Sequence, residues 1–212
     1  MTIDEVSKIV LITLFSAFSV IRIMYYVKTR RAGYRTVIEE RRRYSIWLSI
    51  FICYEVFTFF LFIWFPQMLA WASLPLPAWS RLLGSLLGLV ALLWFVWIHR
   101  SLGSSHSASL RIKDRQVLVT DGPYSRIRHP MYSAFYLLHA AVFFLTANWF
   151  MGVTWLAGLS LVILLRVRRE EEMLLERFGE EYGSYMQRTG RFIPPMRSLS
   201  LRAGRTRSET GP

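Results

Sequence analysis

The chain has one cysteine, Cys53, and only 14 acidic residues against 26 lysines and arginines. A single cysteine excludes both a disulfide within the chain and a cysteine-based metal site. Because Cys53 stands inside an apolar run, we interpret it as a small buried hydrophobe. The sequence also lacks a phosphate-binding glycine pattern and an alternation of strands and helices, which excludes a Rossmann-type domain. Without acidic or cysteine partners spaced for ligation, the histidines predict no metal site.

The shortage of acidic residues leaves a formal net charge of +12. Such an excess often indicates nucleic-acid binding, but here the cations stand mostly between or after long apolar runs. Lysines and arginines in that position orient membrane proteins and contact anionic lipid headgroups. We therefore expect membrane lipids, and no nucleic acid, as partners.

The apolar runs predict an all-α polytopic membrane protein. A helix needs about 20 apolar residues to cross a bilayer. Five runs approach or exceed that length, the fourth being rather short: Val6–Val27, Ile46–Phe65, Trp79–Ile98, Met131–Leu145 and Trp149–Leu165. The last two are separated only by the sequence TAN and predict a tight helical hairpin. The fifth is expected to continue directly into a C-terminal helix from Glu170 onward.

The distribution of positive charge predicts the orientation of these five transmembrane helices. Lysines and arginines number seven in Lys28–Arg43, none in Pro66–Ser80, six in His99–Arg128 and ten from Arg166 onward. Since positively charged loops stay cytoplasmic, the N-terminus is expected outside and the C-terminus inside. An aromatic belt is expected toward the outer ends, formed by Trp64, Trp71, Trp79, Trp149 and Trp155.

By sequence the chain divides into three parts. Residues 1–98 hold three transmembrane helices, and residues 99–196 hold a loop, the helical hairpin and the C-terminal helix. The basic, serine-rich residues 197–212 are expected to be disordered. Within the loop, the residues QVLVT at 116–120 are strand-like.

The segment DGPYSRIRHPMY, residues 121–132, stands at the threshold of the fourth transmembrane helix. Pro130 suits the first position of a helix, with His129 at or beside its cap. A helix start presents free N–H groups and the positive end of the helix dipole, which attract a carboxylate or phosphate. The acidic run from Glu170 lies nearby, because the fourth and fifth helices are hairpin partners. We therefore expect one pocket for a ligand with an amino-acid end, a ribose and an adenine.

The sequence LVTDGPYSRIRHPMY, followed by REEEMLLERFGEEYGSYMQRTGRFIP, resembles the isoprenylcysteine carboxyl methyltransferases and the related phospholipid N-methyltransferases. The resemblance covers roughly Leu118 to Pro194. It implies an integral membrane methyltransferase that uses S-adenosylmethionine, with a cytoplasmic C-terminal helix covering the cofactor pocket. The cofactor-binding residues that it implies are Leu118, Val119, Tyr124, His129, Pro130, Tyr132 and Glu170.

The resemblance also matches Arg166 to a family arginine on the substrate side. Arg166 stands one helical turn before Glu170, so the two share a face. We expect Arg166 to bind and orient an acceptor carboxylate or phosphate, which is a catalytic role. An amine acceptor would need a base instead, and Glu171 is the catalytic candidate for that role.

Glu55 stands in the middle of the second transmembrane helix, where a carboxylate is costly and indicates a function or a partner. By the rise per residue, His139 should lie at a similar depth. Either the two residues pair, or Glu55 lines the acceptor cavity as a substrate-binding residue, and both interpretations stay open. Arg22 is expected to extend to the inner interface. Tyr182 and Tyr185 are expected to pack the C-terminal helix rather than to contact ligand.

The predicted function is methyl transfer to an amphiphilic, lipid-like or prenylated acceptor that reaches the cytoplasmic face from the bilayer. Protein-S-isoprenylcysteine carboxyl O-methylation is the first candidate, and phospholipid N-methylation or small-thiol S-methylation is the alternative. A non-catalytic scaffold or transporter is the alternative from another class. Transporters usually interrupt their helices at mid-bilayer, whereas the breaks here stand at the edge. The sequence leaves the oligomeric state open.

Overall fold

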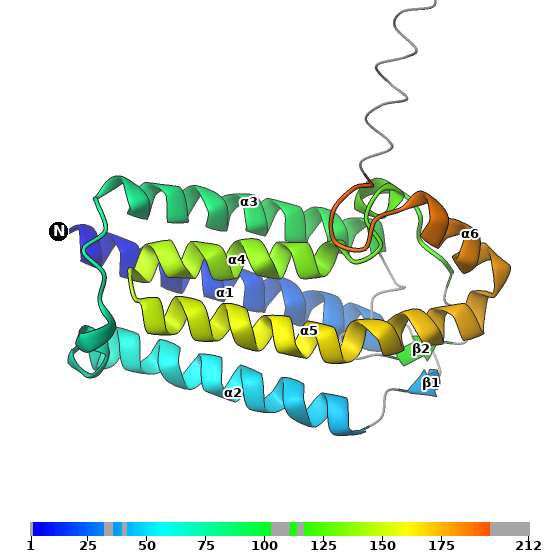
Figure 1. The fold of residues 1–212 in the computed structure, drawn as a ribbon, viewed down its shortest axis with the longest axis horizontal. Helices are drawn as coiled ribbons and strands as arrows, with labels where there is room; N and C mark the ends of the chain where they lie inside the picture. Colours follow the sequence, from blue (N-terminus) through cyan, green and yellow to red (C-terminus); the bar gives the residue numbers. More distant parts are fainter. Residues whose placement is uncertain (1, 32–35, 40–41, 103–110, 114–116, 196–212) are drawn as a thin grey trace, which may run out of the picture.

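The computed structural model describes residues 2–31, 36–39, 42–102, 111–113 and 117–195. Within these ranges five long helices lie side by side (Figure 1). They are α1 (Ile3–Arg31), α2 (Arg42–Trp64), α3 (Trp79–Leu102), α4 (Pro130–Thr146) and α5 (Trp149–Phe178). The shorter helical elements are η1 (Pro66–Ala72), η3 (Gly122–Ser125) and α6 (Glu180–Arg188). The helix α3 runs on through the predicted division between residues 98 and 99.

A short two-stranded sheet joins the segment between α1 and α2 to the segment between α3 and α4. The strands β1 (Thr36–Glu39) and β2 (Arg111–Lys113) pair antiparallel, with Thr36 opposite Lys113. The strand-like residues 116–120 are not the ones that form this sheet. Residues 117–120 have no regular secondary structure, and Gln116 lies outside the described residues.

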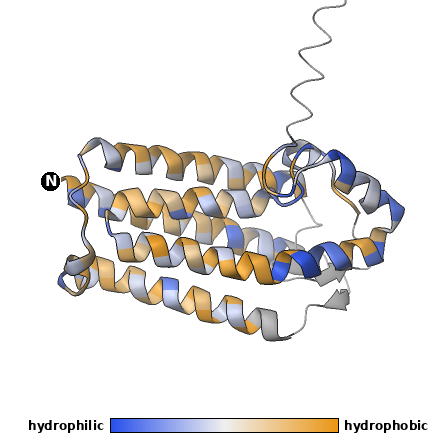
Figure 2. Ribbon diagram, in the orientation of Figure 1, coloured by the Kyte–Doolittle hydropathy of each residue, from blue (hydrophilic) through white to orange (hydrophobic). Residues whose placement is uncertain are grey.

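The helices are those of a multi-pass integral membrane protein. Four in the described part are long and apolar enough to cross a membrane, in α1, α2, α3 and α5, while α4 is a shorter apolar helix of 17 residues. Hydrophobic residues predominate along the long helices, and hydrophilic residues gather at the end that carries α6 (Figure 2). Although α4 is short, it packs against both α3 and α5. The count of five transmembrane helices therefore stays a prediction.

The two ends of the bundle differ in the segments they carry. The N-terminus, η1 and the α4–α5 turn lie at one end, and β1, β2 and α6 lie at the other (Figure 1). The described parts of the three basic segments thus share one end, as the charge distribution predicts. That this end is cytoplasmic remains a prediction.

The turn between α4 and α5 is held by Asn148, which caps α5. Its side-chain oxygen accepts a hydrogen bond from Met151 N at 3.0 Å, and its Nδ2 donates to the carbonyl of Leu69 at 2.8 Å. Ala147 adopts a left-handed conformation with φ 42°, and its carbonyl accepts from Leu74 N at 2.7 Å. The predicted hairpin is therefore tight, and it is tied to η1 and the segment that follows.

Replacing Asn148 by alanine is expected to lower the free energy of unfolding by about 1–3 kcal/mol. The substitution removes a helix cap and leaves the buried carbonyl of Leu69 without its donor. Thermal unfolding in detergent measures the loss. Asn148→Ser keeps a capping oxygen and is expected to recover about half of it. An alanine variant as stable as the wild type would contradict the assignment.

Two single-residue expectations are wrong. Trp155 is fully buried and its Nε1 donates to Thr58 Oγ1 at 2.9 Å, so it belongs to the core rather than to an aromatic belt. The other four tryptophans of the predicted belt have exposed side chains. Cys53 is exposed, because α2 lies at the edge of the bundle and most of its surface faces outward.

Candidate functional site

A cavity of about 260 Å³ is lined by residues from all five long helices, η3, α6 and residues 117–119. Eight residues predicted for ligand or substrate contact line it: Glu55, Leu118, Val119, Tyr124, His129, Tyr132, Arg166 and Glu170. Two others do not: Pro130, whose carbonyl accepts from Trp94 Nε1 at 3.2 Å, and Glu171. The fold thus gathers most of the predicted set around one cavity.

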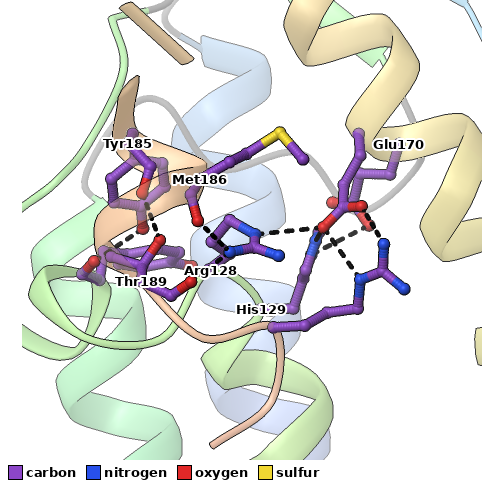
Figure 3. Close-up of polar contacts among 9 residues, drawn as sticks. Arg128, His129, Glu170, Tyr185, Met186 and Thr189 are labelled. Atoms are coloured by element: carbon purple, nitrogen blue, oxygen red, sulfur yellow. Dashed lines mark hydrogen bonds and ion pairs between the residues drawn. The ribbon is translucent and has the colours of Figure 1, made fainter. Parts of the chain in front are cut away.

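The start of α4 and the acidic run of α5 meet in the wall of this cavity. His129 occupies the cap position and Pro130 is the first helical residue, as predicted. Nδ1 of His129 lies 3.5 Å from Oε2 of Glu170, and the hydroxyl of Tyr132 donates to the same oxygen at 2.9 Å. Figure 3 shows His129 and Glu170 turned toward each other. One ligand can therefore contact both.

Glu171 forms a buried cluster with the side chains of Arg128, Arg191 and His129. Its oxygens accept from Arg128 Nε at 3.2 Å, from Arg191 Nε at 3.1 Å and from Arg191 Nη2 at 2.5 Å. Nε2 of His129 lies 3.2 Å from the same carboxylate. This geometry argues against the predicted role of Glu171 as a catalytic base. A carboxylate that compensates these charges resists protonation, and this one does not line the cavity.

The same cluster holds the C-terminal segment over the cavity. Arg128 donates through Nη1 to the carbonyl of Met186 at 2.9 Å and to that of Thr189 (Figure 3). The backbone N–H of Arg128 donates to Gly190 O at 2.8 Å, and that of His129 donates to Arg191 O at 3.0 Å. We refer to residues 189–192 as the strap. It fastens the C-terminal end of α6 to the loop that precedes α4.

The direction of α6 depends on a break at Gly179. The helix α5 continues past the apolar run to Phe178, as predicted, and then ends where Gly179 has φ 54°. Glycine adopts this left-handed conformation without the strain that a Cβ would add. The chain then turns into α6, which places Tyr182 and Tyr185 in the cavity wall, and the Tyr185 hydroxyl donates to Tyr124 O at 2.6 Å.

Tyr182 was expected only to pack α6, but its hydroxyl has another property. The side chain lines the cavity and the residue is 1% exposed, yet the hydroxyl has no hydrogen-bond partner among the described residues. Burial raises the pKa of Tyr182, and the negative charges of Glu171 and Glu170 raise it further, so the hydroxyl stays protonated. A buried donor without an acceptor is costly. A polar ligand in the cavity would satisfy it.

Deeper in the bundle, Glu55 and His139 form a pair. Oε1 of Glu55 lies 2.6 Å from Nε2 of His139, and Nδ1 of His139 lies 2.8 Å from the carbonyl oxygen of Phe135. Both Glu55 and His139 also line the cavity. The positions of these side chains are therefore compatible with both interpretations that the sequence left open: Glu55 pairs with His139, and it also lines the cavity. A substrate-binding role for Glu55 remains a prediction.

Sequence reasoning missed Arg22 and the hydroxyl of Tyr182. Arg22 lines the cavity, whereas it was expected to extend to the interface. A charged residue within a transmembrane helix was the available signal, and it was applied only to Glu55. Tyr182 gave no such signal, because a tyrosine at helical spacing usually belongs to a packed face.

Comparisons with known proteins find sequences similar to this chain. A profile of the family described as phospholipid methyltransferase matches residues 79–181. Protein-S-isoprenylcysteine O-methyltransferase B of Arabidopsis thaliana is 28% identical over 90 residues, 42% of this chain and 46% of that protein. Protein-S-isoprenylcysteine O-methyltransferase of Schizosaccharomyces pombe is 33% identical over 87 residues, 41% of this chain and 36% of that protein. The matches thus span less than half of either relative.

The fold also resembles a solved membrane protein. The structure of a eukaryotic intramembrane Ras methyltransferase, isoprenylcysteine carboxyl methyltransferase, superposes with a TM-score of 0.53 at 22% identity. The superposition covers 87% of this chain and 67% of the other. At this identity the likeness supports a shared fold.

Proposed function

We propose that this chain belongs to the family of isoprenylcysteine carboxyl methyltransferases and phospholipid methyltransferases and is a membrane methyltransferase that uses S-adenosylmethionine. Its acceptor is the carboxylate of a prenylated cysteine. The observation that carries the proposal is the 3.5 Å approach of His129 to Glu170 in the wall of one cavity. We place this cavity at the cytoplasmic face, which an acceptor reaches from the bilayer.

The residues around the cavity fit the proposed cofactor. Glu170 supplies negative charge for hydroxyls or an ammonium group, and the hydroxyl of Tyr182, which has no partner within the described ranges, supplies a donor. Leu118 and Val119, as the family resemblance implies, would border the adenine with Tyr124. Bound S-adenosylmethionine supplies a methyl group on a sulfonium, which a nucleophile takes while the sulfur keeps the electrons of the broken bond.

The positions of Arg166 and Glu171 favour carboxyl methylation over the alternative acceptors. A carboxylate needs only alignment and removal of its water, whereas an amine must first lose a proton. Arg166 is buried and lines the cavity, where it can align a carboxylate. Glu171, the candidate base for an amine, is held by cations away from the cavity.

The Glu55–His139 pair is the observation that keeps an amine or thiol acceptor as the second candidate. Because a carbonyl only accepts, Nδ1 of His139 must carry the proton shared with Phe135 O. Nε2 faces the carboxylate of Glu55 at 2.6 Å. A histidine–carboxylate pair of this kind can accept a proton from a bound amine or thiol.

Two measurements on the purified full chain in detergent test the proposal. Calorimetry is expected to detect binding of S-adenosylmethionine, and absence of binding by folded protein would overturn the proposal. Transfer of labelled methyl is then measured to S-farnesylcysteine, to a phospholipid amine and to a small thiol. Mild base releases methyl from an ester but not from an amine or thioether. If all of the transferred label is stable to base, the acceptor is an amine or a thiol, the second candidate, and not a carboxylate.

Tyr182→Phe distinguishes a ligand contact from a packing role. Removing an unsatisfied buried hydroxyl is expected to raise the unfolding temperature of the protein alone. If the hydroxyl donates to the cofactor, the dissociation constant for S-adenosylmethionine rises about 5- to 10-fold at the same time. Tyr185→Phe, which removes a satisfied hydroxyl, is expected to lower the unfolding temperature instead. An unchanged dissociation constant in Tyr182→Phe would make the residue a packing residue only.

A further inference from the structure

Arg22 is a cationic residue of the cavity wall that the family profile does not reach. It stands on α1, whereas the profile matches residues 79–181. Along α1 it lies about 28 Å from Ile3, and Arg166 lies about 26 Å along α5 from Trp149, at a rise of about 1.5 Å per residue. Both helices begin at the same end of the bundle (Figure 1). The two arginines therefore stand at similar depth.

The charge of Arg22 has little local compensation. Arg22 is within electrostatic range of Arg166 and of Glu55, but forms no hydrogen bond or ion pair in the part of the chain that the structure describes. The nearby carboxylate, Glu55, is bonded to His139 at 2.6 Å. A guanidinium that is partly buried in a membrane protein without such a partner is costly. An anionic ligand beside Arg22 in the cavity would offset this cost.

We propose that Arg22 binds the carboxylate of the methyl acceptor together with Arg166. This inference rests on the proposed function and extends it to a residue on α1. Two guanidinium groups from different helices bind the two oxygens of one carboxylate more selectively than either does alone. Methylation converts that carboxylate into a neutral ester. The ester no longer satisfies the two cations, so the same pair favours acceptor over product.

The test compares wild type, Arg22→Gln, Arg22→Lys and Lys28→Gln in detergent. Lys28→Gln is the matched control, because it removes an exposed positive charge farther along the same helix. Binding of S-farnesylcysteine and of its carboxamide is measured by calorimetry, and KM and kcat are measured for methyl transfer to the carboxylate. The dissociation constant for S-adenosylmethionine and the unfolding temperature are recorded for every protein.

Wild type is expected to bind the carboxylate more tightly than the carboxamide. Arg22→Gln is expected to raise KM and the dissociation constant for the carboxylate roughly 10- to 100-fold, with smaller changes in kcat and in carboxamide binding. The KM and the dissociation constant of Arg22→Lys for the carboxylate should lie between those of wild type and Arg22→Gln, since lysine keeps the charge without the planar guanidinium. Binding of S-adenosylmethionine should be unchanged in all four proteins.

Unchanged carboxylate binding in folded Arg22→Gln or Arg22→Lys would overturn the inference. So would an equal loss of carboxamide and carboxylate binding, or a matching loss in Lys28→Gln. Failure of the proposed function has a different signature, because wild type would then transfer no methyl to the carboxylate. The calorimetric comparison between carboxylate and carboxamide decides the role of Arg22 in that case too.

Discussion

Arg166→Ala is expected to lower kcat for methyl transfer about 100-fold while the dissociation constant for S-adenosylmethionine changes less than about threefold. Arg166 lies one turn before Glu170 on α5, and its side chain is buried in the cavity wall. In the proposed reaction it holds the acceptor oxygen in line with the methyl group. Loss of alignment affects the chemical step, while Glu170, His129 and Tyr182 remain to hold the cofactor.

Arg168→Ala is the matched control for this substitution. Arg168 is exposed on the same helix, so its removal takes away one charge without opening the cavity. Its kinetics should resemble those of wild type. Rapid-quench measurement of one turnover, combined with calorimetry, separates the chemical step from binding. Equal losses of turnover and cofactor affinity in Arg166→Ala would remove the role assigned to Arg166.

Glu171→Ala is expected to lower the free energy of unfolding by about 3–5 kcal/mol. The side chains of Arg128 and His129 are mostly buried; without this carboxylate the Arg128 guanidinium loses its main compensation and Nε2 of His129 loses its partner. The strap loses the ion pair between Arg191 and Glu171 as well. Because α6 is held over the cavity by these contacts, binding of S-adenosylmethionine should fall with stability. Thermal unfolding and calorimetry measure the two effects.

The neighbouring acids supply the controls. Glu172→Ala removes a carboxylate whose side chain is 63% exposed and is expected to change stability by less than about 0.5 kcal/mol. Glu170→Ala is expected to weaken cofactor binding with little loss of stability, since its side chain faces the cavity. If Glu170→Ala and Glu171→Ala destabilised the protein equally, the division of roles between them would be wrong.

Sequence alone determined the features that depend on spacing along one helix. The apolar runs located four of the long helices and the shorter α4, and Pro130 with the cap residue His129 located the start of α4. The rise per residue placed Glu55 and His139 at one depth, where the structure pairs them at 2.6 Å. Positive charge grouped the three basic segments at one end of the bundle. These features need no knowledge of how the helices turn toward each other.

Only the tertiary structure decided which way each side chain faces. Glu170 and Glu171 are adjacent in sequence, but successive residues of an α-helix point about 100° apart, so one lines the cavity and the other meets Arg128, His129 and Arg191. For the same reason, the sequence did not show that Arg22 and Tyr182 line the cavity or that Trp155 is buried. Hydrophobic spacing fixes the position of a residue along a helix axis. The rotation of that helix depends on contacts between segments that are distant in sequence.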